Sequence, residues 1–139
     1  MTPRLTLTAM LHTIIFGVII ATLSGCERES LQQQCANMVK HEKRRMPRNV
    51  AQGLVLDSMK YNIADNTITY YHTMSDSLYS DEAISRGRNQ LQLQLTQDIS
   101  NSVGLRRLKE EGVSFKYVYT SDRSKKVRFT LHISNKDLR

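Results

Sequence analysis

Two ribbons of alternating polar and apolar residues constrain the fold of this chain most strongly. The first ribbon has the arms LVLDSMKYN (54–62) and TITYYHTMS (67–75), which are rich in β-branched and aromatic residues. The second has the arms VSFKYVYT (113–120) and KVRFTLHIS (126–134). In each ribbon a short polar turn joins the two arms, so each ribbon predicts a β-hairpin.

Helical patterns occupy the segments outside the ribbons. Residues 29–46 carry apolar side chains at helical spacing, and Pro47 ends this pattern. A second helix is expected from a cap at Ser80 through about residue 100, with one apolar stripe. The short helix GLRRLKEE (104–111) follows and ends at Gly112.

The resulting element order, α-β-β-α-α-β-β, predicts an α+β fold. Two hairpins separated by helices are expected to form a four-stranded antiparallel sheet with the helices on one face. The connections are short throughout, which leaves no lid or large insertion that would house an active site.

The N-terminal segment has the anatomy of a secretory signal peptide: Arg4, an apolar run over 11–23, and then small residues. The run is too short, and too diluted with polar residues, for a membrane-spanning helix. Leu23-Ser24-Gly25-Cys26 resembles the lipobox of bacterial lipoproteins. That resemblance implies cleavage before Cys26 and lipidation of Cys26; a retained anchor or an ordinary export signal is the alternative.

The N-terminal interpretation divides the chain into two parts. Residues 1–25 are expected to be a cleaved lipoprotein signal peptide, and residues 26–139 a single α+β periplasmic domain anchored through acyl chains on Cys26. Glu27 stands where lipoproteins retained in the inner membrane commonly carry aspartate. We therefore expect lipid anchoring to the bacterial outer membrane, on its periplasmic face.

Three segments resemble those of a widespread group of small exported bacterial proteins, most of which have no assigned function. The segments are NTITYYHT, LRRLKEEGVSFKYVYTSD and KVRFTLHIS. The resemblance implies the α+β fold and carries no catalytic residue. In size, lipidation and α+β order the chain is also similar to the lipoprotein pilotins, which escort secretin subunits of type II secretion systems to the outer membrane.

The sequence holds no recognisable catalytic or cofactor motif. His41, His72 and His132 lie on a predicted helix and two separate strands, and strand histidines are more often surface polar residues than a metal site. Metal-protease, redox, phosphate-loop and nucleophile-elbow patterns are missing. We therefore expect no enzymatic activity, no cofactor and no metal.

One dense charge run, KHEKRRMPR (40–48), suggests an anionic partner. The periplasm argues against nucleic acid and favours phospholipid headgroups or acidic proteins. A solvated helix end, whose cations favour the C-terminal dipole, is the alternative. The residues predicted to contact the membrane surface are Lys40, Lys43, Arg44, Arg45 and Arg48.

The tyrosines on the predicted strands form a second candidate surface. Strand alternation places Tyr70 and Tyr71 on opposite faces, so at least one of them faces away from the helices. Exposed sheet tyrosines are common in binding surfaces, although core packing explains them equally well. The predicted partner residues are Tyr70, Tyr71, Tyr117 and Tyr119.

Cys35 is either a buried apolar residue or a thiol that pairs between molecules.

These features favour a non-enzymatic outer-membrane lipoprotein that binds a protein partner in the envelope, for example as an assembly or escort factor of the pilotin kind. The alternative is an exclusion or immunity lipoprotein of a mobile element. The sequence leaves open the identity of the partner, the system served and the oligomeric state.

Overall fold

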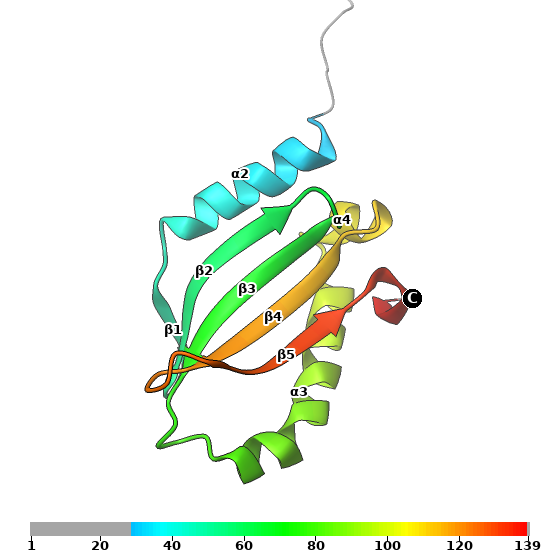
Figure 1. The fold of residues 1–139 in the computed structure, drawn as a ribbon. Helices are drawn as coiled ribbons and strands as arrows, with labels where there is room; N and C mark the ends of the chain where they lie inside the picture. Colours follow the sequence, from blue (N-terminus) through cyan, green and yellow to red (C-terminus); the bar gives the residue numbers. More distant parts are fainter. Residues whose placement is uncertain (1–28, 139) are drawn as a thin grey trace, which may run out of the picture.

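The computed structural model describes residues 29–138, which form one sheet with helices packed against it (Figure 1). No helix in this range is long and apolar enough to cross a bilayer. The elements in chain order are α2 (Leu31–Lys43), β1 (Arg48–Ala51), β2 (Leu54–Asn62), β3 (Thr67–Met74), α3 (Asp81–Asn101), α4 (Arg106–Glu110), β4 (Ser114–Ser121), β5 (Val127–Ile133) and the short 3-10 helix η1 (Asn135–Leu138).

The sheet has five strands in the order β1-β2-β3-β4-β5, and it is mixed. Three neighbouring pairs are antiparallel, whereas β3 and β4 run parallel, with Thr67 opposite Ser114 at the start of both strands. The predicted four-stranded antiparallel sheet is therefore wrong, although the α+β class is confirmed. The physical reason is the helical connection: α3 and α4 return the chain to the end of the sheet where β3 began, as parallel pairing requires.

The strand missed by the sequence analysis, β1, lies at one edge of the sheet. It falls on the end of the basic run and pairs with β2 only over Leu54–Leu56. The turn between them contains Gly53 at φ +68°, where an added Cβ would lie 2.6 Å from Cδ1 of Leu78. The positive φ therefore favours glycine at this turn, and a larger residue would also displace the side chain of Leu78.

The two predicted hairpins and the predicted cap at Ser80 are present, and the structure adds a cap at Ser30. Strands β2 and β3 form the first hairpin, and β4 and β5 form the second. The hydroxyl of Ser80 accepts a hydrogen bond from the backbone N–H of Ala83 at 3.2 Å, and Ser30 caps α2 in the same way. Helix α2 ends at Lys43, three residues before the predicted end at Met46.

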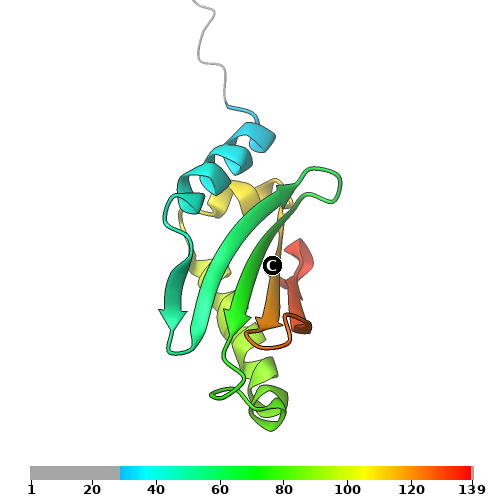
Figure 2. The same ribbon diagram turned by 60° about the vertical axis from the view of Figure 1, so that its left-hand side comes forward.

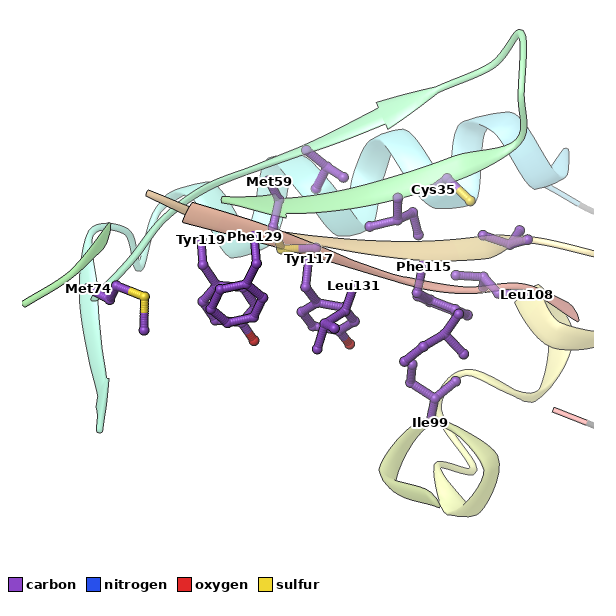
Figure 3. Packing of buried hydrophobic residues seen from close by; sticks show 14 residues of the cluster. Cys35, Met59, Met74, Ile99, Leu108, Phe115, Tyr117, Tyr119, Phe129 and Leu131 are labelled. Atoms are coloured by element: carbon purple, nitrogen blue, oxygen red, sulfur yellow. The ribbon is translucent and has the colours of Figure 1, made fainter. Parts of the chain in front are cut away.

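One face of the sheet carries the hydrophobic core, and we call it the covered face. Its side chains include Phe115, Tyr117 and Leu131, which point toward α3 in Figure 3. Helices α2, α3 and α4 all contribute to the same cluster, through Cys35, Ile99 and Leu108 respectively. These packed side chains position the helices, and Figure 2 shows α3 behind the sheet.

The opposite face, which we call the open face, is rich in threonine and lysine. The strand registers place Thr69, Thr73 and Thr120 on it, together with Lys60 and Lys116. In Figure 1 this face looks toward the reader, with α3 and α4 behind the sheet. Alternation of this kind is typical of a sheet that packs helices on one side and meets solvent on the other.

The edge strand β5 is tied to α3 by an arginine. Arg88 donates from Nη2 to the carbonyl oxygen of Thr130 at 3.0 Å, and its guanidinium carbon lies 5.7 Å from the ring centroid of Phe129. Arg88 therefore links the helix to both the backbone and a side chain of the outermost strand.

Candidate interaction surfaces

A ladder of stacked rings crosses the covered face, because directly paired residues of β3, β4 and β5 are aromatic. The rings of Tyr70 and Tyr117 stack with centroids 4.8 Å apart. In the next row, His72 stacks on Tyr119 at 4.9 Å, and Tyr119 stacks on Phe129 at 4.4 Å. Three of the four predicted partner tyrosines therefore lie beneath the helices.

Burial keeps the ring groups of this ladder neutral. It raises the pKa of Tyr70 to about 12 and the pKa of Tyr119 to about 12, and it also raises the pKa of Tyr117. Burial lowers the pKa of His72 to about 4, although the nearby charge of Asp57 opposes that change. The phenols and the imidazole are thus uncharged near neutral pH.

An apolar hollow of about 480 Å³ lies between the sheet and the first half of α3, next to this ladder. We call it the α3 hollow. It exists because α3 presents the small residues Ala83 and Gly87 there, and an added Cβ on Gly87 would meet nothing within 4 Å. Its apolar lining includes Leu54, Met74, Leu78, Ile84, Tyr119 and Phe129.

The loop before α3 forms one wall of the α3 hollow and is held by Arg128. This arginine donates to the carbonyl oxygen of Tyr79 at 2.6 Å and pairs with Asp76 at 3.2 Å and Asp81 at 2.6 Å. The hydroxyl of Ser121 also donates to Asp76 at 2.6 Å. The wall of the hollow is therefore fixed by charged groups that bridge the loop and the β4–β5 hairpin.

Tyr71 is the one predicted partner tyrosine on the open face. It is half-buried, and the Nζ atom of Lys60 lies 5.7 Å from the centroid of its ring. The alternation of Tyr70 and Tyr71 between opposite faces agrees with the strand register.

The basic run lies at the end of α2 and the start of β1. Lys40, Lys43, Arg44 and Arg45 are all exposed. Arg48 is partly neutralised, because its Nη1 atom lies 3.0 Å from Oε2 of Glu42. Lys40 and Lys43 also line a second hollow, beside α2.

The histidines and Cys35 do not come together. His72 lies on the covered face of β3, whereas His132 is exposed on β5, with β4 between the two strands. In residues 29–138 no three His, Cys, Asp or Glu side chains gather as metal ligands would. Cys35 is fully buried in the core, where burial raises the pKa of its thiol. Cys26, the predicted lipidation site, lies outside the described residues.

Sequence reasoning singled out Tyr119, Lys40 and Lys43, which line the two hollows, but it missed the other residues that shape them. One signal for the α3 hollow was the pair of small residues Ala83 and Gly87, which are one helical turn apart. Another was Leu78, an apolar turn residue that is 52% exposed. For the hollow beside α2 the signal was Ile63, which is 60% exposed at the tip of the first hairpin.

Three solved structures share this fold. A crystal structure of a candidate secreted protein from Pseudomonas aeruginosa matches with a TM-score of 0.68 at 14% identity, over 83% of this chain and 100% of that one. The type 2 secretion system pilotin EpsS of Vibrio vulnificus matches with a TM-score of 0.61 at 8% identity, over 76% and 89%. The type II secretion system pilotin AspS of Vibrio cholerae matches with a TM-score of 0.53 at 11% identity, over 75% and 88%.

At these identities the likeness concerns the fold, and the predicted resemblance to pilotins is confirmed at that level. No curated protein sequence matches the chain. A family model does match it over residues 30–129, from the cap of α2 to the middle of β5. The chain therefore belongs to the family described as a domain of unknown function, DUF8479.

Proposed function

We propose that this protein is a non-enzymatic, lipid-anchored protein of the bacterial outer membrane that binds a protein partner in the envelope. Its role would be that of an assembly or escort factor of the pilotin kind. The observation that carries this proposal is the α3 hollow, an apolar site in a fold shared with two pilotins of type II secretion systems.

The chemistry of the α3 hollow favours an apolar protein segment as its occupant. Aromatic and aliphatic side chains supply the walls, and Arg88 is the one charged residue among those that line the hollow. Interface cores are rich in aromatic residues and arginine and poor in other charged residues. An amphipathic helix that inserts its apolar face into such a groove is a common mode of recognition.

The same surroundings argue for binding rather than catalysis. Tyr119 lines the α3 hollow with a pKa of about 12, and its stacking partner His72 has a pKa of about 4. Groups suited to acid–base catalysis have pKa values close to the working pH. These two are held far from it, and we infer that they serve packing.

The test fills the α3 hollow without disturbing the core. The variant Gly87→Leu adds a side chain where an added Cβ meets nothing within 4 Å, and it replaces a helix-breaking residue. We expect the full chain with this change to keep or raise its thermal stability. We also expect it to lose a partner that the unaltered chain captures by cross-linking in intact cells.

The matched control is Gln90→Leu, which adds the same side chain at an exposed position of α3 outside the α3 hollow. It should capture the partner as well as the unaltered chain does. Equal capture by both variants would contradict a role for the α3 hollow. Capture of a toxin or a conjugation protein would favour the exclusion or immunity alternative instead.

The anchor is tested separately through Cys26. The variant Cys26→Ser should remain uncut and take up no labelled palmitate, because the lipobox thiol is the acceptor of the lipid. Normal maturation and membrane fractionation of this variant would refute the lipoprotein assignment.

A further inference from the structure

A second hollow, of about 470 Å³, lies between α2 and the hairpin end of β2. We call it the lysine hollow. Helix α2 lines it with one face, through residues spaced from Gln32 to Lys43, and β2 and its turn contribute Tyr61 and Ile63. Ala36, Val39 and these two residues make the lining apolar. The lysine hollow shares no residue with the α3 hollow.

The charged residues that line the lysine hollow are all positive, among the residues that the structure describes. Within residues 29–138 they are Lys40, Lys43 and Lys60, and no acidic residue of this range lines the hollow. The acidic residue of the same helix, Glu42, is engaged elsewhere, because it pairs with Arg48 at 3.0 Å. Lys40 and Lys43 are neighbours on the helix surface, where like charges are unfavourable unless an anion joins them.

The geometry points to a docking site for an acidic amphipathic helix of a partner protein. The carboxylates of such a helix would meet the three lysines, while its apolar side chains would cover Ala36, Tyr61 and the exposed Ile63. Contiguous apolar surface rimmed by charge marks an interaction site. A helix that offers apolar residues along one side and carboxylates beside them is the complement of this arrangement.

The shape of the site favours a helix as its occupant. The lining residues of α2 extend over about three helical turns, or roughly 16 Å. The apolar lining runs along α2 beside the end of β2, and a partner helix can follow it over that length. Lys60 also approaches the ring of Tyr71, which extends the contact surface onto the open face.

The test uses the full chain in non-ionic detergent micelles and a fluorescein-labelled synthetic helix with leucines along one side and glutamates along the other. Fluorescence anisotropy measures binding. We expect a version with glutamine in place of glutamate to bind roughly tenfold more weakly, as three exposed ion pairs would give. The triple variant of Lys40, Lys43 and Lys60 to glutamine should weaken binding of the acidic peptide by a similar factor.

The matched control changes three other exposed lysines, Lys116, Lys126 and Lys136, to glutamine and lowers the net charge equally. It should bind like the unaltered chain. A further variant, Ile63→Ser, alters an exposed residue. It should weaken the binding of both the glutamate and the glutamine peptide, because it removes apolar contact.

Three outcomes would overturn the proposal. Equal loss of peptide binding in the two triple variants would show that binding depends on the net charge of the protein alone. Displacement of the peptide by phosphatidylglycerol added to the micelles would assign the lysines to the membrane. Absence of peptide binding would exclude the helix as occupant, while capture through the α3 hollow would be unaffected.

Discussion

The covered and open faces of the sheet come from the same strands but differ in chemistry. On the covered face, rings of β3, β4 and β5 stack beneath the helices, and burial shifts their pKa values. On the open face, threonines and lysines surround one half-buried tyrosine. Tyr70 and Tyr71 are adjacent in the chain, yet one lies in the core and the other beneath Lys60. Position in the sheet, and not residue type, therefore determines what each tyrosine does.

The largest difference in stability is expected between variants at tyrosines of the two faces. Tyr117 is 9% exposed in the core, and its change to alanine should cost about 3 kcal/mol or more in the free energy of unfolding. The change Tyr71→Ala should cost less, about 1 kcal/mol. Denaturant unfolding of both variants measures the contrast, and equal costs would contradict the assignment of faces.

The next difference concerns pH, since His72 lies on the covered face and His132 on the open face. The unfolded chain protonates His72 near its ordinary pKa of 6.5, whereas the folded chain does so at about 4. The contribution of His72 to the free energy of unfolding should therefore be fully present above about pH 6.5. It should fall by about 3 kcal/mol as the pH decreases toward 4. The variant His72→Phe should lose this component of the pH profile of unfolding, and His132→Gln should keep it.

A smaller effect is expected at Arg128, the extra residue of a bulge between β4 and β5. The bulge turns this arginine toward the loop before α3, where it pairs with half-buried Asp76 and exposed Asp81. Arg128→Gln should cost about 2 kcal/mol in the free energy of unfolding, because the arginine is 13% exposed and its loss leaves Asp76 without a cationic partner. Asp81→Asn should cost about 0.5 kcal/mol or less, and thermal unfolding distinguishes the two.

The smallest effect is expected on the open face itself. Lys60→Gln removes the cation above Tyr71 and should change stability by about 0.5 kcal/mol. A loss comparable to that of Tyr117→Ala would mean that Lys60 has a structural role and that the lysine hollow is part of the core.

Local patterns predicted strands β2 to β5, the two hairpins and the cap at Ser80, because these depend on alternation, turn chemistry and capping within a few residues. The direction in which one hairpin pairs with the other was not predictable in this way. The alternation of residues in β3 and β4 is the same whether the two strands pair in parallel or antiparallel. Only the path of α3 and α4 determines which of the two pairings forms. Strand β1 gave no signal, since all four of its residues are exposed.

The candidate surfaces were predictable in part for a similar reason. Alternation separates Tyr70 from Tyr71, but it does not say which face receives the helices, because tyrosine suits both environments. The hollows depend on the distance between elements far apart in sequence. Lys60 and Lys40, for example, line one hollow although they come from a strand and a helix.

The hydrogen bond from Arg88 to Thr130 has a consequence for self-association. An outermost strand offers unpaired backbone groups to other chains, and proteins protect such strands with charge, shortness or cover. On β5 an arginine occupies one carbonyl, and at the opposite edge β1 is four residues long and begins with Arg48. The two end strands, β1 and β5, are consequently poor templates for strand addition by another copy.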